Sequence, residues 1–145
     1  MSRGMRHIVQ KSGGALQTSR TPKNCARRRK VSRTIPALTS MEVVTLESLV
    51  RFADGKMQKV PLFDSEKCFC DLYCLSPGQD QRVHTHEESD KIYVVLKGSG
   101  EFHIGGQERT LVTGQAVIAR PGEAHGVRNT SEENLVLLVF MSPKP

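Results

Sequence analysis

From residue 41 to the end, the chain alternates apolar and polar residues and is interrupted by glycine or proline every eight to twelve residues. Successive side chains of a β-strand point to opposite faces, so this period of two predicts half-buried strands separated by turns. Strands are predicted over residues 59–62, 68–75, 82–86, 92–96, 101–104, 108–112, 116–119, 126–130 and 135–141, and one short helix over 47–52. Many short strands with almost no helix indicate an all-β sandwich or a small barrel.

Two of these strands have a predicted place in a sheet. Pro61 interrupts the segment 59–62, and because proline cannot donate a ladder hydrogen bond, this strand is predicted at a sheet edge or between subunits. The segment 135–141 is apolar on both faces and is predicted to be a central, covered strand. Small barrels expose sheet edges, and pairing across a two-fold axis protects them, so we expect a homodimer.

The positive charge of the chain is concentrated in its first 40 residues. They contain ten Lys or Arg and no acid, whereas residues 41–145 contain eleven Lys or Arg and fifteen Asp or Glu. Because the first segment is also poor in aromatic residues, we predict that residues 1–40 form a disordered basic segment before a barrel domain over 41–145. Three interpretations of the segment stay open: an organelle transit peptide, a basic arm that contacts phosphates, or an upstream extension of a reading frame that starts at Met41.

The predicted domain lacks the features of two function classes. It is mildly acidic and has no basic stripe interleaved with aromatic residues, so we expect no nucleic acid to bind the barrel. No apolar run approaches the ~20 residues that a membrane span needs, so no membrane association is expected. The sequence therefore predicts a soluble, cytoplasmic protein, or an organellar one if the source is eukaryotic and residues 1–40 are a transit peptide.

Three histidines are spaced so that their side chains could meet. His84 and His86, two positions apart in a predicted strand, point to the same face and lie about 7 Å apart along it. A Pro-Gly turn at 121–122 precedes His125 and brings a third imidazole from another strand. A lone histidine is usually an ordinary core or surface residue, as we interpret His103. Three at these spacings predict a site for a divalent transition metal: iron, manganese, nickel, zinc or copper.

Two glycines frame the histidine pair. The spacing is Gly78-x5-His84-x-His86-x4-Lys91-x6-Gly98. It resembles the first motif of the small, single-domain type 2 cupins, RmlC-like conserved-barrel proteins. In that motif a glutamate stands where this chain has Lys91.

The run that ends at Asn129 is similar to the second motif of the same family, Gly-x5-Pro-x-Gly-x2-His-x3-Asn. Gly114, Gly122, His125 and Asn129 are in register with it, and Arg120 replaces its first proline. The two motifs together are specific for the fold.

The resemblance covers about residues 60–141 and implies a jelly-roll (double-stranded β-helix) barrel whose metal ligands are His84, His86 and His125. Cupins include dioxygenases, isomerases, epimerases, decarboxylases and proteins that only bind ligands, so the fold does not decide the chemistry. We expect a metal-dependent enzyme, such as a dioxygenase or isomerase, that acts on a small anionic substrate. The alternative is a non-catalytic cupin that binds or senses a small ligand with weak or no metal.

Lys91 replaces the acidic ligand of the family, and three roles are open for this part of the site. Lys91 could turn toward the acids of the adjacent loop 87–90 and leave a three-histidine centre. Asp90 could act as the replacement ligand, although its side chain is shorter and lies on the opposite strand face. Lys91 could instead point inward and hold an anionic substrate beside the metal. Tyr93 shares a strand face with Lys91 and is a second candidate for substrate binding.

Overall fold

The structure, a computed structural model, describes residues 41–145. The predictions of a disordered segment, a transit peptide, a basic arm and an upstream extension all concern residues 1–40, which lie outside the described residues. The described residues form a short 3-10 helix and nine strands: η1 (Leu46–Leu49), β1 (Gln58–Asp64), β2 (Phe69–Leu75), β3 (Asp80–His84), β4 (Asp90–Lys97), β5 (Ser99–Ile104), β6 (Gln107–Val112), β7 (Ala116–Ala119), β8 (His125–Arg128) and β9 (Leu135–Ser142). Within 41–145, no helix has the length and apolar character needed to cross a membrane.

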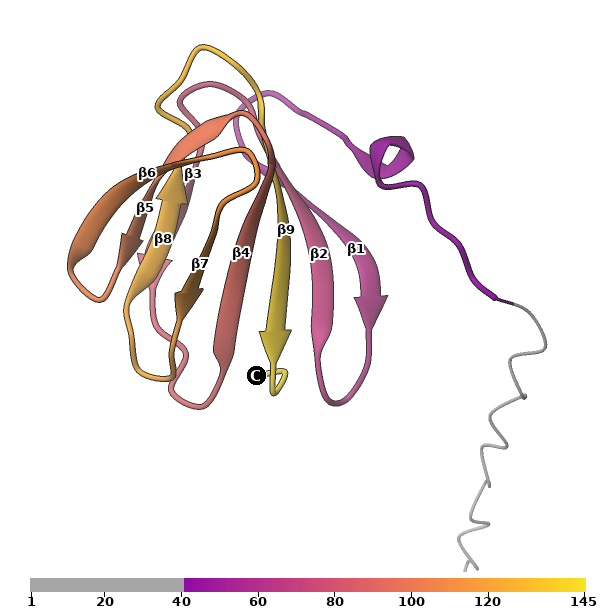
Figure 1. The fold of residues 1–145 in the computed structure, drawn as a ribbon, viewed down its shortest axis with the longest axis vertical. Helices are drawn as coiled ribbons and strands as arrows, with labels where there is room; N and C mark the ends of the chain where they lie inside the picture. Colours follow the sequence, from indigo (N-terminus) through magenta and orange to yellow (C-terminus); the bar gives the residue numbers. More distant parts are fainter. Residues whose placement is uncertain (1–40) are drawn as a thin grey trace, which may run out of the picture. The chain divides into compact units, whose positions relative to one another are not determined.

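The strands form two antiparallel sheets that face each other (Figure 1). The five-stranded sheet has the order β1-β2-β9-β4-β7, and the four-stranded sheet has the order β3-β8-β5-β6. Strands distant in sequence are neighbours: β9 pairs with both β2 and β4, and β8 pairs with both β3 and β5. The prediction of an all-β jelly-roll barrel is confirmed.

Each predicted strand is present, with its ends shifted by a few residues. β1 lies at a sheet edge, as Pro61 predicted, and its register with β2 shifts between Pro61 and Phe63. β9 pairs on both sides, as predicted for a central strand. The predicted helix over 47–52 is the single 3-10 turn η1, which packs with the apolar outer side of the five-stranded sheet.

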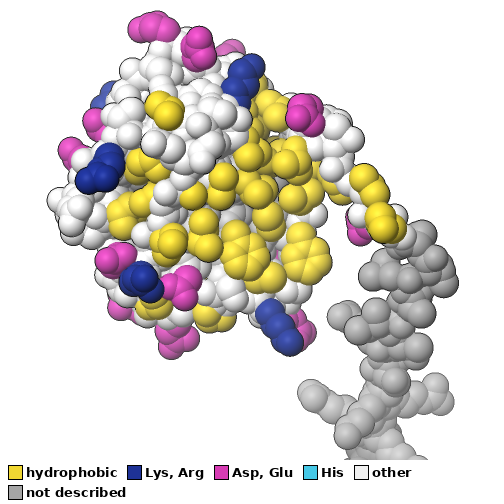
Figure 2. Space-filling view, viewed as in Figure 1, with side chains coloured by type: hydrophobic (Ala, Val, Ile, Leu, Met, Phe, Trp, Pro, Cys, Tyr) yellow, Lys and Arg dark blue, Asp and Glu magenta, His cyan; other side chains and the backbone are white. Residues whose placement is uncertain are grey.

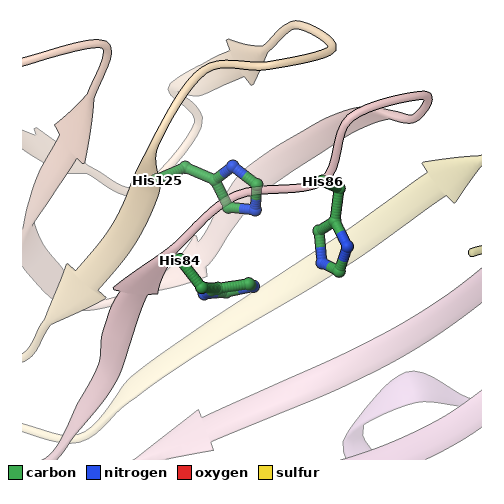
Figure 3. Close-up of side chains that lie close together, drawn as sticks. All are labelled: His84, His86 and His125. Atoms are coloured by element: carbon green, nitrogen blue, oxygen red, sulfur yellow. The ribbon is translucent and has the colours of Figure 1, made fainter.

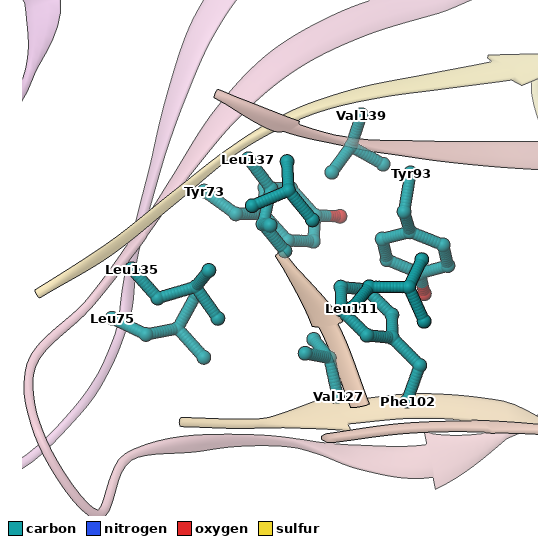
Figure 4. Close-up of a cluster of buried hydrophobic side chains, with 10 residues drawn as sticks. Tyr73, Leu75, Tyr93, Phe102, Leu111, Val127, Leu135, Leu137 and Val139 are labelled. Atoms are coloured by element: carbon teal, nitrogen blue, oxygen red, sulfur yellow. The ribbon is translucent and has the colours of Figure 1, made fainter. Parts of the chain in front are cut away.

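Alternate residues of β9 fill the space between the sheets. Leu135, Leu137 and Val139 have no exposed surface. They belong to one cluster with members from both sheets, which comprises Tyr73, Leu75, Tyr93, Val95, Phe102, Leu111, Val127, Leu135, Leu137 and Val139 (Figure 4). Burial of one large apolar side chain contributes about 1.5–3 kcal/mol, so this cluster is the main attraction between the sheets.

One polar side chain in the interior holds a loop in place. The buried amide nitrogen of Asn129 donates to the carbonyl oxygens of Leu75 at 3.0 Å and Glu133 at 2.7 Å. The amide oxygen accepts from the backbone N–H and the hydroxyl of Ser131, at 3.1 and 2.8 Å. Asn129 therefore ties the connection between β8 and β9 to the end of β2, which is the structural reason for an asparagine at this motif position.

Candidate metal centre

The three predicted histidines lie together at the ends of β3 and β8 (Figure 3). His84 ends β3 and pairs in register with His125, the first residue of β8. The ring centroids of His84 and His86 are 4.9 Å apart, those of His84 and His125 4.5 Å, and those of His86 and His125 5.4 Å. One nitrogen from each ring lies within 4.8 Å of the other two, and no other His, Cys, Asp or Glu of residues 41–145 joins this group. Two nitrogens bound to one ion lie at most about 4.2 Å apart, so small side-chain rotations would suffice for coordination.

The prediction that strand alternation brings His84 and His86 to one face is wrong, because His86 is not in a strand. The strand predicted over 82–86 ends at His84, and its register with β8 shifts between Gln81 and His84. His86 lies in the connection after β3, where its carbonyl oxygen accepts a hydrogen bond from the N–H of Gly122 at 2.9 Å. This bond joins the connection after β3 to the turn before His125. His86 therefore lies near His125 because of this hydrogen bond, and not because it shares a strand face with His84.

A glycine after His125 allows β3 to approach β8 closely. A Cβ atom on Gly126 would lie 2.8 Å from the carbonyl oxygen of Gln81 and 3.0 Å from Cγ2 of Val83. A larger residue would push the two strands apart and would separate His84 from His125. Gly126 therefore helps to keep His84 and His125 paired in register.

Hydrogen bonds to the main chain leave one nitrogen of two rings available for a ligand. The Nδ1–H of His84 donates to the carbonyl oxygen of Arg82, and that of His125 to the carbonyl oxygen of Glu123, both at 2.8 Å. Because a carbonyl oxygen only accepts, Nδ1 carries the proton and Nε2 of the neutral ring has a free lone pair. Nε2 of His125 is buried and has no partner within residues 41–145. A buried nitrogen without a partner is unfavourable, and metal coordination would satisfy it.

Burial keeps the three rings neutral. It is the largest cause of the lowered pKa of His84, of His86 and of His125, whose pKa falls to about 4. The positive charge of Lys91 contributes to the decrease in all three. Neutral imidazole is the form that binds a metal ion, so at pH 7 the rings need lose no proton before they bind.

Lys91 points inward from β4, and its side chain is 1% exposed. Its Nζ lies 5.7 Å from the ring centroid of Tyr73 and 5.1 Å from that of Tyr93. It has no ion pair with any acid of residues 41–145, and it does not turn toward the loop acids. The pKa of Lys91 is lowered to about 7, mainly by burial and also by the charge of Lys59, while the charge of Asp71 opposes the decrease. Of the three roles left open by the sequence, this geometry fits the inward one.

The two other candidate residues of this strand differ in position. Tyr93 lies on the face of Lys91, fully buried, and its hydroxyl donates to Oε1 of Gln81 at 2.8 Å. Burial raises the pKa of Tyr93 far above its ordinary value, so the hydroxyl stays protonated at neutral pH. Asp90 is exposed and is not a member of the histidine group.

Three polar neighbours of Lys91 were not predicted from the sequence. Tyr73 of β2 stacks its ring below Lys91 and also below Lys59 of β1, whose Nζ is 5.0 Å from the ring centroid. Asp71, on the same face of β2, is half-buried, and burial raises its pKa. The period of two predicts that Asp71 and Tyr73 share a face, but no local signal says that this face meets Lys91.

A groove lies elsewhere on the barrel and carries none of these groups. This groove of about 640 Å³ is lined by residues of β5, β6 and β7 and of their connections, and its charged residues are Arg109, Arg120 and Glu123. None of the three histidines lines it, and neither does Lys91. Both arginines are exposed to solvent, so we assign the chemistry to the histidine cluster.

Comparison with known proteins gives a consistent family assignment. A family model described as "Cupin domain" matches residues 71–141. The crystal structure of TT1209 from Thermus thermophilus superposes with a TM-score of 0.70 and is 46% identical, and the match covers 72% of this chain and 100% of that one.

Two curated relatives match over a shorter segment. The oxalate-binding protein of Thermotoga maritima is 34% identical over 67 residues, which are 46% of this chain and 55% of that protein. The pectin degradation protein KdgF of Dickeya dadantii is 44% identical over 61 residues, 42% of this chain and 54% of that protein. The chain thus spans about half the length of these two relatives.

Proposed function

Because the chain belongs to the cupin superfamily, we propose that it binds a divalent transition metal through His84, His86 and His125 and acts on a small anionic molecule held beside that metal. The observation that carries the proposal is the convergence of three neutral imidazoles whose ligand nitrogens lie within 4.8 Å of one another. Chance rarely brings three such rings together with main-chain hydrogen bonds that orient two of them.

The donor set suits iron, manganese, nickel, zinc or copper. Imidazole nitrogen is a good ligand for these ions, and three protein ligands leave coordination positions open for a small molecule. A bound ion would supply Lewis acidity toward the oxygen atoms of that molecule. The residues of the chain hold the rings neutral and oriented, through burial and through the carbonyl oxygens of Arg82 and Glu123.

The charges around Lys91 favour an anionic ligand. A charged lysine and a divalent ion about 5 Å apart repel by about 6–7 kcal/mol at an effective dielectric constant of 20, and the attraction of an anion to both would offset this repulsion. Lys59 and Lys91 both lie over the ring of Tyr73, with Asp71 as the acid that interacts with both. Lys91 is therefore the group that would orient the anion, and Tyr93 would border it. The name of the Thermotoga relative, an oxalate-binding protein, agrees with a small carboxylate.

The reaction we propose is of the dioxygenase or isomerase type. Non-catalytic binding is the second candidate, and one observation favours it. Tyr93, whose ring centroid lies 6.2 Å from that of His125, keeps its proton near pH 7 because burial raises its pKa well above the neutral range, so it cannot accept a proton from a bound molecule. Among the residues that the structure describes, this leaves Lys91 as the group beside the three rings that exchanges a proton near pH 7. Lys91 is already assigned to holding the anion, and this shortage of proton-transfer groups is what favours binding without catalysis.

An anion-binding experiment tests the role of Lys91. We expect zinc-loaded protein to bind oxalate, and Lys91→Gln to bind it about 10- to 100-fold more weakly, because the variant loses a charged hydrogen-bond donor. Lys97→Gln, at the exposed end of β4, should bind oxalate like the wild type. Isothermal titration calorimetry measures both affinities.

The same titration with oxamide, the neutral diamide, separates charge from shape. Equal binding of oxalate by the wild type and by Lys91→Gln would remove the anion role of Lys91. Turnover of a bound carboxylate in air, followed by NMR, would favour the dioxygenase or isomerase function. Binding without turnover would favour non-catalytic binding.

We also propose that two copies of the barrel associate through the outer face of the five-stranded sheet. One row of apolar side chains crosses all five strands in register: Phe63, Cys70, Phe140, Ile92 and Ile118. Phe63 is 54% exposed, Phe140 39% and Ile118 51%, and Figure 2 shows a broad apolar area on this face. Apolar areas of this kind mark protein contacts. The row has no charged member, so two copies can meet on it without removing water from a charged side chain of the row. A second copy of the barrel therefore fits this face better than a charged partner does.

A charge in the centre of this face is expected to separate the copies. Phe140→Glu should convert the dimer to monomer at micromolar concentration, because each copy would bury an unpaired carboxylate. Val112→Glu, which adds the same charge at an exposed position of β6, should remain dimeric. Sedimentation velocity reports the masses, and a monomeric wild type would contradict the proposal.

A further inference from the structure

Lys91 has a setting in which a lysine can act as a nucleophile. Its side chain is buried among the rings of Tyr73 and Tyr93, and it forms no ion pair within residues 41–145. Burial of an ammonium group is unfavourable, and the nearby charges of Lys59 and Asp71 oppose each other, so the neutral amine is favoured relative to water. A desolvated neutral lysine is the form that attacks electrophilic carbon.

The interior that Lys91 faces contains no carboxylate ligand. The histidine group has three neutral members, and no Asp or Glu of residues 41–145 joins it. The ring of Tyr93 is next to both partners, with its centroid 5.1 Å from Nζ of Lys91 and 6.2 Å from the ring centroid of His125. Nε2 of His125 is buried and unpartnered in the described range. The charge of Lys91 also acts on all three histidine rings, so an anion formed on Lys91 would act on the same rings with the opposite sign.

We propose that Lys91 is a site of reversible carboxylation by carbon dioxide, and that this modification competes with the anionic ligand for the space beside the three histidines. The inference rests on the proposed function for the competing ligand, but the modification itself does not require it. In the step, the lone pair of Nζ forms a bond to the carbon of CO2 while one C=O π pair moves onto oxygen. Nζ then loses a proton to water, and the product is a lysine carbamate. No atom is oxidised or reduced.

The carbamate changes the sign of the charge at this position. A protonated Lys91 attracts an anion and repels a divalent ion, whereas the carbamate repels the anion and offers two oxygen atoms to the ion. The carboxylated lysine thus supplies the acidic ligand that the described part of the chain does not place in the histidine group. Dissolved CO2 would therefore strengthen metal binding and weaken the binding of an anionic ligand at the same site.

The modification is tested by ¹³C NMR of the full-length protein with ¹³C-labelled bicarbonate, with and without zinc. We expect one carbamate signal in the wild type that increases with zinc and disappears in Lys91→Arg. Lys59→Arg, which changes the exposed lysine over the same tyrosine ring, should keep the signal. Trapping with trimethyloxonium followed by peptide mass spectrometry identifies the modified residue, and Lys91→Met serves if the arginine variant does not fold.

Competition is tested by titrating oxalate into zinc-loaded protein with and without bicarbonate. We expect bicarbonate to weaken oxalate binding by about tenfold in the wild type. Bicarbonate could also bind the ion directly, and such binding would appear equally in Lys91→Arg, in which we expect no change. Zinc binding without a carbamate on Lys91 would overturn this inference and leave the proposed function intact. A carbamate on Lys91 without zinc binding would support this inference and refute the proposed metal site.

Discussion

Replacement of Lys91 by methionine is expected to raise the free energy of unfolding of the metal-free protein at pH 7 by about 2–4 kcal/mol. The pKa of Lys91 falls from 10.5 to about 7 because burial disfavours the ammonium form. The folded state must therefore give up the proton, or bury the charge, while the unfolded chain keeps it in water. Methionine has a similar length, carries no charge and can occupy the same space between the tyrosine rings.

The same substitution should remove a dependence of stability on pH. Between pH 7 and about 9, the unfolded wild type binds a proton at Lys91 that the folded state does not bind, so stability rises with pH, by about 2 kcal/mol over this range. Burial raises the pKa of Cys70 and Cys74 above 9.0, so these thiols oppose the trend only near and above pH 9. The decreased pKa values of the three histidines act below pH 6.5.

Urea denaturation at several pH values, in buffer free of metal and carbon dioxide, measures both effects. Lys91→Met should show a higher stability at pH 7 and no rise from pH 7 to 9. Lys97→Met, at the exposed end of β4, should behave like the wild type. The same rise with pH in wild type and in Lys91→Met would show that Lys91 is charged and solvated in the folded protein.

Replacement of His125 by alanine is expected to weaken metal binding by more than about 100-fold. Loss of a residue that only supports a metal ligand typically lowers affinity 10- to 100-fold, so loss of a ligand should exceed that range. His125 is the most buried of the three rings, and its Nε2 is the unpartnered nitrogen of the group. Its removal leaves two histidines, one of which lies in a connection outside the strands.

The matched control is His103→Ala. His103 is a half-buried histidine whose Nδ1 lies 3.4 Å from a carboxylate oxygen of Glu108, and it is not a member of the histidine group. Metal content of protein purified without a histidine tag, and zinc titration of the metal-free protein, should match the wild type for His103→Ala. Equal zinc affinity in wild type and in His125→Ala would refute the three-histidine centre.

Much of the fold follows from local patterns. The period of two predicts each strand to within a few residues, and Pro61 correctly predicts that β1 is an edge strand. The apolar character of the segment 135–141 correctly predicts a central strand, because β9 is paired on both sides. These features are local, since they depend on hydrogen-bonding capacity and on side-chain alternation within one segment.

The candidate site was predictable only in part. The spacing of the histidines and the cupin motifs predict the three histidines that the structure brings together, and the alternation along the strand places Lys91 and Tyr93 on one face. The convergence itself has a different cause from the predicted one. His86 lies beyond the end of β3, and a hydrogen bond from Gly122 to its carbonyl oxygen brings it to the group.

Local sequence was thus enough to predict the type of fold, the three imidazoles and the common face of Lys91 and Tyr93. What Lys91 meets depends on the packing of the two sheets: the rings of two tyrosines, no ion-paired acid among residues 41–145, and three neutral histidines from strands of the other sheet and their connection. The same packing aligns the apolar outer residues of five strands in one row. The physical reason is that the pKa of a buried amine and the register of distant strands both depend on groups far away in sequence. No periodicity within a single strand contains that information.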